Sequence, residues 1–488
     1  MLPLKSMKEQ NIKNVPRLVI GAPQGRSGKT TFTLGLLRAF SRQGMAVQPF
    51  KKGPDYIDAS WHTAAAGYIC RNLDSFFMGK QEICSSVLSQ SIGKTITIIE
   101  GAMGFYDGLD LQGSSSTAEI AKVTRSPVLL VVDMTRMTRS VAAMVMGYQH
   151  FDPGVQIVGV VLNKVARARH EKLAREAIEE FCKIPVVGAI PKDVNLSIPD
   201  RHLGLVTNGE MKETDRLLDY LADIISDHVD LDKILRLAQN APEIPSLAGD
   251  LVPNLAKYGA KNRALHPKIG FIQDEAFSFY YPENLEALKQ LGADLVPINA
   301  LVDAQLPENL DGLYIGGGFP EVFAAKLEQN WDLRREIRLA GEKGLPIYAE
   351  CGGLMYLGRS IRASSQSYEM VGLLPFDSQM ESKPQGHGYT IMKANSGQPW
   401  FEEAVEIKGH EFHNSRLINV DPNVKFGFTV KRGNGIDGQQ DGICYKNVFA
   451  TYHHIHALGC PAWAERMVNL ASTYGQSKWS RIEKVAGQ

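Results

Sequence analysis

Short apolar segments alternate with helical patterns along the first half of the chain, and this alternation restricts the fold more than any other feature. Most of the segments are continuous apolar runs, as expected of strands that are buried on both faces of a sheet. They lie at 17–22, 45–50, 95–100, 127–133, 155–163 and 185–190, with helical patterns at 30–42, 140–149 and 169–181. This β-α-β rhythm predicts a parallel sheet covered by helices.

A second α/β rhythm begins near residue 268, after a segment without periodicity. Residues 241–264 contain three prolines and two glycines and are interpreted as a linker. A chain of 488 residues is too long for one ordinary core. We therefore expect two α/β domains, of which the second becomes strand-rich after about Gly386. The predicted divisions are a first domain at 14–240, a linker at 241–266 and a second domain at 267–475.

Composition and charge exclude several classes of protein. Apolar residues make up 44% of the chain and charged residues 22%, which argues against disorder as the main state. The 53 basic and 53 acidic residues balance, so neither nucleic acid nor another extended polyanion is an expected partner. The longest apolar run is too short to cross a bilayer and no secretory signal is visible, so a cytoplasmic protein without membrane contact is expected. The six cysteines form no CxxC pair, which argues against a zinc knuckle.

A glycine-containing loop between the first strand and the first helix predicts a nucleotide site. The loop reads GAPQGRSGKT from residue 21 to residue 30. Glycines let backbone N–H groups surround phosphate oxygens, a lysine neutralises their charge, and a hydroxyl group holds Mg²⁺. The strict pattern would place glycine where Pro23 stands, but the strand before the loop and the helix after it favour ATP binding. The residues expected at the nucleotide are Gly25, Gly28, Lys29, Thr30 and Thr31.

Polar residues follow the next strands at the ends where ligands of parallel sheets bind. Glu100 is interpreted as a second contact to Mg²⁺ or as a solvated carboxylate. Asn163 is interpreted as a reader of the base edge or, equally, as a turn residue. The loops at 51–58 and 100–108 combine lysines, acids and aromatic residues. Together they indicate a site that holds a polyanion and a metal ion.

A cysteine at a strand-to-helix turn marks the second half of the chain. Cys351 follows an apolar strand and precedes two glycines and a helical stretch, as in a nucleophile elbow. We expect the helix N-terminus to lower the pKa of the thiol. A glycine-rich loop at 316–318 could direct N–H groups toward an oxyanion, and the histidines at 453–456 could supply a base. This set predicts acyl transfer through a thioester; the alternative is that Cys351 merely packs.

Eight motifs taken together resemble those of the cobyrinic acid a,c-diamide synthases. In chain order they are APQGRSGKTT, KKGPDYIDASWH, CRNLD, EGAMGFYDG, GGGFPE, AECGGLMYL, GHEFHNS and TYHHIH. That family joins a dethiobiotin-synthetase-like ATP domain, here a P-loop parallel-sheet domain, to a class I glutamine amidotransferase domain of the cobyric-acid type. The resemblance covers residues 17–471.

The resemblance implies roles for residues of the second domain. Cys351 would attack the side-chain amide of glutamine and release ammonia, with His454 as its base and His456 as the competing candidate. The oxyanion donors would be the N–H of Gly352 and that of Gly317 or its neighbour Gly318. Class I glutaminases usually carry His-x-Glu, but position 456 is histidine. The resemblance therefore implies a cysteine–histidine pair oriented by a group other than a carboxylate, with slow basal glutamine hydrolysis.

The resemblance also implies the reaction of the first domain. Thr30, Glu100 and Asp55 match positions that hold Mg²⁺, and the substrate positions are Tyr56, Asp58 and Asp107. ATP would phosphorylate the a and c acetate carboxylates of a tetrapyrrole, and ammonia would displace the phosphate.

Cobyrinic acid is the expected substrate; nickel-sirohydrochlorin, hydrogenobyrinic acid and sirohaem are the alternatives. A P-loop switch ATPase with a non-catalytic second domain is the alternative from another class, although it would carry lysine where this chain has Gln24. The expected partners are small molecules, with a homodimer left open.

Overall fold

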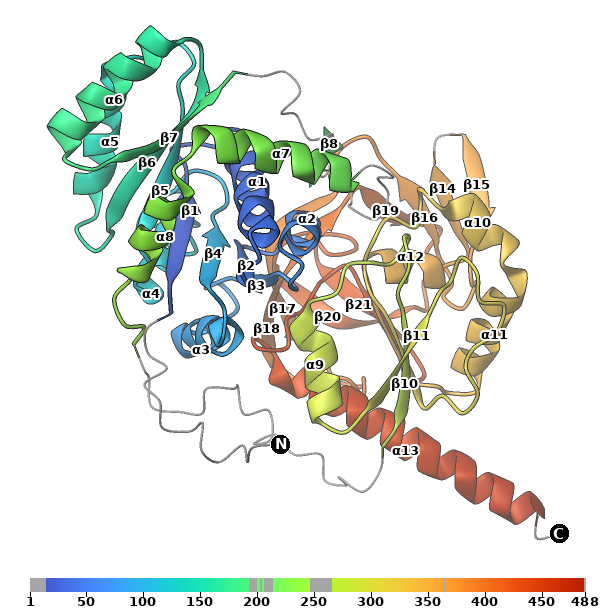
Figure 1. Ribbon diagram of the computed structural model, residues 1–488. Helices are drawn as coiled ribbons and strands as arrows, with labels where there is room; N and C mark the ends of the chain where they lie inside the picture. Colours follow the sequence, from blue (N-terminus) through green and yellow to red (C-terminus); the bar gives the residue numbers. More distant parts are fainter. Residues whose placement is uncertain are drawn as a thin grey trace, which may run out of the picture. The chain divides into compact units, whose positions relative to one another are not determined.

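A computed structural model describes residues 15–192, 200–201, 204–205, 214–245, 266–363 and 365–486, with side chains from 200–205 and 479–486 left aside. The chain forms two compact units that divide between Pro253 and Asn254 (Figure 1). Of the predicted linker at 241–266, residues 246–265 lie outside the described residues. The two predicted α/β domains are confirmed.

The first unit is built on a seven-stranded sheet of order β3-β2-β4-β1-β5-β6-β7. Every neighbouring pair is parallel, and nearly all strand residues are buried, so the predicted parallel sheet is confirmed. The strands are β1 (Arg17–Gly21), β2 (Val47–Lys52), β3 (Arg71–Leu73), β4 (Ile96–Glu100), β5 (Val128–Asp133), β6 (Ile157–Val165) and β7 (Val186–Pro191). The edge strand β3 was not predicted because three residues give no periodic signal.

Helices of this unit cover the sheet and connect its strands. They are α1 (Lys29–Arg42), α2 (Tyr56–Ala66), α3 (Lys80–Ser91), α4 (Thr117–Val123), α5 (Ser140–Phe151), α6 (Ala168–Cys182), α7 (Thr214–His228) and α8 (Leu231–Gln239). A short pair, β8 (Asp200–Arg201) and β9 (Gly204–Leu205), is antiparallel. Helix α8 begins after Asp230, whose side chain accepts a hydrogen bond from Lys233 N and caps the helix.

The second unit contains a nine-stranded sheet of order β11-β10-β12-β13-β22-β21-β20-β17-β18. The strands are β10 (Lys268–Ile272), β11 (Asp294–Ile298), β12 (Gly312–Ile315), β13 (Ile347–Glu350), β17 (Gly386–Ala394), β18 (Glu406–His413), β20 (Lys425–Arg432), β21 (Gln440–Tyr445) and β22 (Val448–Thr451). The sheet is parallel from β11 to β22 and antiparallel beyond. The predicted strand-rich region after Gly386 is therefore present.

Among the described residues, a four-stranded sheet and five helices complete this unit. The sheet has the order β15-β14-β16-β19, with β14 (Ser360–Ala363), β15 (Gln366–Glu369), β16 (Asp377–Met380) and β19 (Ser415–Ile418). The helices are α9 (Pro282–Gln290), α10 (Ala324–Gln329), α11 (Trp331–Glu342), α12 (Gly352–Leu357) and α13 (Pro461–Ala486). The long helix α13, red in Figure 1, was not predicted. None of the helices in the described ranges is long and apolar enough to span a membrane.

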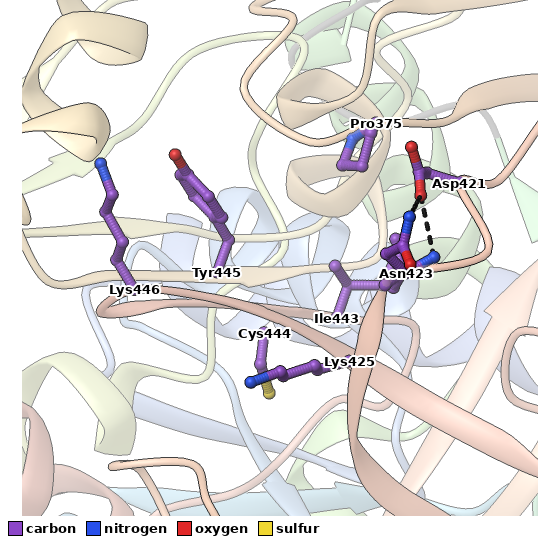
Figure 2. A pocket seen from close by; sticks show the side chains of 9 residues that line it. Pro375, Asp421, Asn423, Lys425, Ile443, Cys444, Tyr445 and Lys446 are labelled. Carbon is purple, nitrogen blue, oxygen red and sulfur yellow. Dashed lines mark hydrogen bonds between the residues drawn. The ribbon is translucent and has the colours of Figure 1, made fainter.

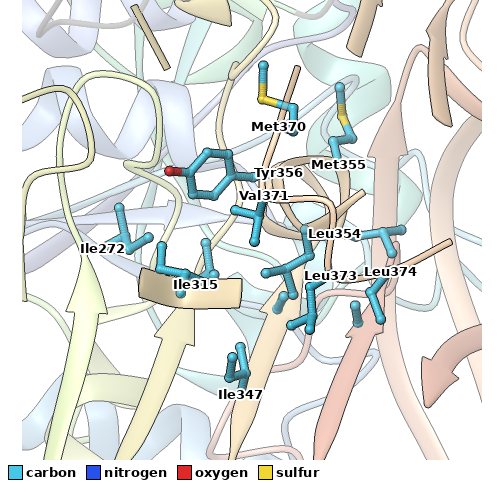
Figure 3. Close-up of a cluster of buried hydrophobic side chains, with 14 of the residues drawn as sticks. Ile272, Ile315, Ile347, Leu354, Met355, Tyr356, Met370, Val371, Leu373 and Leu374 are labelled. Atoms are coloured by element: carbon cyan, nitrogen blue, oxygen red, sulfur yellow. The ribbon is translucent and has the colours of Figure 1, made fainter. Parts of the chain in front are cut away.

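Alternate residues of the central strands build two separate hydrophobic clusters, one on each face of the sheet. Ile315 and Ile347 belong to one cluster, together with residues of α12 and of the segment after β15 (Figure 3). Tyr314 and Tyr348 belong to the other, where Trp463 of α13 packs on both rings. This period of two fixes the direction of each side chain up to the ends of β12 and β13, where the glycine-rich loop and Cys351 begin.

Candidate functional site

The predicted phosphate loop lies between β1 and α1. Gly28 has φ 86°, and a Cβ atom there would lie 2.2 Å from the side-chain nitrogen of Asn163. That nitrogen donates to Ser27 O at 2.9 Å, while the Asn163 oxygen accepts from Lys164 N. The Asn163 amide therefore contacts the phosphate loop directly.

Lys29 is the first residue of α1, and its side chain is buried against the loop after β4. Its Nζ atom donates to Met103 O at 2.7 Å and to Gln24 O at 3.5 Å. Burial lowers the pKa of Lys29, and the charge of Glu100 acts in the opposite direction. Thr31 follows in the first turn of α1, and Gly25 lies on the exposed part of the loop with open space around its Cα atom. The lysine is thus held by carbonyl oxygens that a phosphate group could replace.

Glu100, at the end of β4, is the centre of a buried group of charges. Its Oε1 atom accepts from the Thr30 hydroxyl at 2.7 Å and lies 2.8 Å from Lys51 Nζ. Its Oε2 atom lies 2.6 Å from His62 Nε2. Burial acts to raise the pKa of Glu100, but Lys51 and His62 hold it well below the usual range. Glu100 is therefore an ionised carboxylate and not a solvated one.

The predicted substrate and metal positions on α2 lie around the same charges. Asp55 is the N-cap of α2, and its side chain accepts from Asp58 N at 2.9 Å. Burial, followed by the charge of Asp58, raises the pKa of Asp55 to about 6. The Asp58 carboxylate pairs with Lys51, and Tyr56 is the first residue of the helix. The structure thus connects Asp58 to Glu100 through one lysine.

Asp107 lies on the loop after β4, where its carboxylate accepts from Gly104 N at 3.0 Å. A Cβ atom at Gly104 would lie 2.8 Å from Pro23 O, so this turn packs directly on the phosphate loop. Asp107 therefore shapes the loop that approaches the nucleotide site.

Thr30 and Glu100 are suitable ligands for Mg²⁺. Hard cations take oxygen ligands, and Mg²⁺ is usually held by one or two carboxylates together with substrate phosphates. A hydroxyl and an ionised carboxylate only 2.7 Å apart, at the start of α1, match that chemistry. Across the described ranges, no group of three or more His, Cys, Asp or Glu residues could hold a metal ion.

Sequence reasoning missed His62, although it is fully buried and contacts Glu100 directly. The available signal was its spacing from Asp58, because residues i and i+4 share one face of a helix. The side chains of Asp58 and His62, both on α2, contact the ion pair of Lys51 and Glu100.

Cys351 lies between β13 and α12 with φ 49° and ψ −101°, a strained conformation for a residue with a side chain. The glycines after it permit the turn. A Cβ atom at Gly353 would lie 2.5 Å from Ile315 O, and one at Gly352 would lie 3.1 Å from Gly318 N. This is the predicted elbow, with the glycine-rich loop packed against it.

The thiol of Cys351 is almost completely buried, at 5% exposure. Burial, followed by the negative charge of Glu321, raises its pKa, and the N–H of Gly352 opposes this effect only in part. The expectation of a lowered pKa is therefore wrong, because desolvation exceeds the effect of the short helix. Ionisation of this thiol requires a base that accepts its proton.

His454 is brought to the elbow by strand pairing. β22 runs parallel to β13 with Thr451 opposite Glu350, and Cys351 N donates to Thr451 O at 2.7 Å. The residues that follow each strand therefore emerge at the same edge of the sheet. A Cβ atom at Gly317 would lie 2.6 Å from Cε1 of His454, so the imidazole contacts the predicted oxyanion loop.

A carboxylate lies beside the imidazole of His454. Nδ1 of His454 lies 3.4 Å from Oε2 of Glu350, the residue immediately before the cysteine. The expectation was an orienting group other than a carboxylate, because position 456 is histidine; the carboxylate found beside His454 comes instead from the neighbouring strand. His410 of β18 stacks on the His454 ring, with centroids 4.8 Å apart.

The other two histidines of the segment have different surroundings. His456 Nε2 lies 3.5 Å from Glu283 Oε2, and its ring packs against Tyr281. His453 Nδ1 lies 2.6 Å from the Thr390 hydroxyl. Both histidines are buried. His456 therefore remains the competing candidate, with its own carboxylate.

A pocket of about 370 Å³ lies elsewhere in the second unit, over β20 and β21 (Figure 2). Its lining includes Pro375, Asp421, Lys425 and Cys444. The Asp421 carboxylate accepts from the backbone and side-chain nitrogens of Asn423, at 2.8 and 3.0 Å. None of the predicted site residues lines this pocket.

Comparisons with known proteins agree with this geometry. Residues 18–206 match the model of a CobQ/CobB/MinD/ParA nucleotide binding domain, and residues 268–461 match that of a CobB/CobQ-like glutamine amidotransferase domain. A protein of Magnetococcus marinus named cobyrinate a,c-diamide synthase is 47% identical over 450 residues, which cover 92% of this chain and 96% of that protein. The chain belongs to the cobyrinate a,c-diamide synthase family.

Other members of the cobyrinate a,c-diamide synthase family are similar to this chain over most of its length. A relative of that name from Archaeoglobus fulgidus is 42% identical and covers 94% of this chain and 98% of its own. One from Listeria innocua is 40% identical, with 91% and 97% covered. The resemblance stated from the motifs is thereby confirmed.

Proposed function

We propose that this chain amidates the a and c acetate carboxylates of cobyrinic acid, using ATP and glutamine. The observation that carries this proposal is that one chain of this family contains both a phosphate-loop hydroxyl bonded to a buried carboxylate and a cysteine elbow beside a histidine–carboxylate pair. The first arrangement suits carboxylate activation, and the second suits release of ammonia from an amide.

In the second unit, Cys351 acts as the nucleophile. Because burial keeps the thiol protonated, His454 accepts its proton as the sulfur attacks the amide carbon of glutamine. The N–H groups of Gly352 and Gly317 stabilise the oxyanion that forms. His454 then returns the proton to the departing ammonia, and water hydrolyses the thioester.

In the first unit, Lys29 leaves the carbonyl oxygens of Met103 and Gln24 and pairs with the phosphates of ATP. Thr30, Glu100 and Asp55 would hold Mg²⁺, whose charge would neutralise that of the transferred phosphate. Tyr56, Asp58 and Asp107 position the tetrapyrrole acetate. Gly25, Gly28 and Thr31 surround the phosphates, and Asn163 supports their loop.

The chemical reason for this coupling is that a carboxylate is a poor acyl donor to ammonia. Transfer of phosphate to the acetate oxygen creates an acyl phosphate, whose phosphate group leaves when ammonia attacks. Exclusion of water protects the acyl phosphate from hydrolysis. The partners are therefore small molecules, in a cytoplasmic setting that supplies ATP.

Incubation with ATP, Mg²⁺ and glutamine and a panel of tetrapyrrole acids tests the proposal, with amides counted by mass spectrometry. We expect cobyrinic acid to gain two amides and nickel-sirohydrochlorin, hydrogenobyrinic acid and sirohaem to gain fewer. Cys351→Ser should abolish amidation from glutamine and retain amidation from ammonium chloride. ATP hydrolysis without amidation of any acid would contradict the proposal and favour a switch ATPase.

A further inference from the structure

Glu350 is the last residue of β13 and is completely buried. Its Oε2 atom lies 3.4 Å from His454 Nδ1 and accepts from the Tyr314 hydroxyl at 3.2 Å. Its Oε1 atom accepts from Ile455 N at 3.3 Å. We propose that Glu350 is the positioning carboxylate of the glutaminase site, which orients His454 and stabilises its protonated form. This inference rests on the proposed function.

The surroundings of the Glu350 carboxylate consist of two neutral hydrogen-bond donors and one histidine. A buried carboxylate is costly unless it is hydrogen-bonded and paired. Tyr314 and Ile455 supply neutral donors, and within the described part of the chain the ion pair recorded for Glu350 is the one with His454. When His454 takes the proton of Cys351, this carboxylate lies beside the resulting imidazolium.

The contact also defines the orientation of the ring. A carboxylate beside Nδ1 favours the tautomer in which Nδ1 carries the proton and Nε2 is the unprotonated nitrogen that accepts another. The separation of 3.4 Å is longer than a strong hydrogen bond, but such contacts often shorten when substrate binds. His410, stacked on the ring, restricts its rotation.

The fold explains why the acid precedes the nucleophile in sequence. Side chains alternate along β13, so Glu350 lies on the same face as Tyr348, and the neighbouring strand β12 presents Tyr314 there. Thr451 pairs with Glu350, which places the residues after β22 beside this carboxylate. Two adjacent residues therefore supply the carboxylate and the thiol.

A second histidine–carboxylate pair in the same unit provides the sharpest comparison. His456 and Glu283 lie 3.5 Å apart, almost the separation of His454 and Glu350. The contact of the His454 ring with Gly317 of the oxyanion loop favours the His454 pair. The same Glu→Gln substitution in each pair distinguishes the two.

The test measures glutamine hydrolysis by the full chain and its Glu350→Gln variant. The new side chain at position 350 is similar in size to glutamate and keeps an oxygen that accepts from Tyr314 or Ile455, but it carries no charge. We expect kcat to fall on the order of 100-fold or more, with little change in the KM for glutamine. Alkylation of Cys351 by iodoacetamide, followed on its own peptide by mass spectrometry, should slow as well. Amidation from ammonium chloride should persist, which shows that the first unit of the variant is folded.

Three further variants make each outcome decisive. Glu350→Asp keeps the charge and should recover part of kcat, which a purely structural role would not predict. Glu283→Gln should retain glutamine hydrolysis. Wild-type kcat in Glu350→Gln, or a loss in Glu283→Gln alone, would overturn the inference. Retention of glutamine-dependent amidation in Cys351→Ser would instead overturn the proposed function.

Discussion

The hydroxyl group of Thr30 donates a hydrogen bond of 2.7 Å to Oε1 of Glu100. Thr30 lies in α1, which follows β1, and Glu100 is the last residue of β4. The two strands are parallel neighbours in the sheet. A residue of the phosphate loop and a carboxylate 70 positions away are thereby joined at one edge of the sheet. The same carboxylate also meets Lys51 and His62, so one side chain connects the loop to α2.

Glu100→Gln should disable the first unit and spare the second. The substitution removes the anionic partner of Lys51 and the expected Mg²⁺ ligand, so charge on the transferred phosphate is less well neutralised. We expect amidation from glutamine and from ammonium chloride to fall by about 100-fold or more. Glutamine hydrolysis without ATP should remain. Equal losses of amidation and of glutamine hydrolysis would indicate unfolding instead.

His62→Asn should destabilise the first unit. The shorter side chain does not reach Glu100, so a buried carboxylate loses a partner that is now 2.6 Å away. Loss of such a partner costs about 1–3 kcal/mol. Urea unfolding followed by circular dichroism measures this difference. The exposed His150 offers a matched control, and His150→Asn should change the free energy of unfolding by less than about 0.5 kcal/mol.

The sequence predicted those parts of the molecule whose signal is local. The central strands of the first sheet were found because they are continuous apolar runs, and the elbow was found because Cys351 stands between a strand and two glycines. The helix α2 was missed because residues 51–58 were interpreted as one loop, whereas Asp55 caps a helix that begins at Tyr56 and carries Asp58 and His62.

The carboxylate of the glutaminase site was missed for a different reason. The motif of class I glutaminases places an acid two residues after the histidine, and this chain has His456 at that position. The pairing of Glu350 with Thr451 depends on the register of two strands about 100 residues apart in sequence, which no local pattern contains. Site residues that are placed by strand register or by a helix face could therefore be identified only in the structure.

Gly353→Ala should disrupt the cysteine elbow. The new Cβ atom would lie 2.5 Å from Ile315 O, a backbone atom of β12 that cannot move without distorting the sheet. We expect lower thermal stability and loss of glutamine hydrolysis, with ATP binding by the first unit retained. Gly147→Ala is the control, because open space surrounds that helical glycine and alanine should stabilise α5 by about 0.5–1 kcal/mol. Full glutaminase activity in Gly353→Ala would contradict the close packing of the elbow.

Acid should destabilise the second unit through His453. Burial, followed by the proximity of His454, lowers the pKa of His453 to about 3. The unfolded chain, with a histidine pKa of about 6.5, binds more protons between these values, so the free energy of unfolding falls as the pH falls through this window. From pH 7 to pH 5 this residue alone should remove about 2 kcal/mol.

His453→Gln cannot take up the proton and tests this prediction. Its free energy of unfolding should be lower at pH 7, where the Thr390 contact is altered, but should change about 2 kcal/mol less than that of the unsubstituted chain between pH 7 and pH 5. Urea unfolding followed by the fluorescence of the buried Trp400 and Trp463 measures the difference. Burial raises the pKa of Asp441 in the same unit to about 6, which makes acid stabilising there, but this effect is common to both proteins and cancels in the comparison. Identical pH dependence of the two proteins would show that His453 is able to take up a proton within the folded unit.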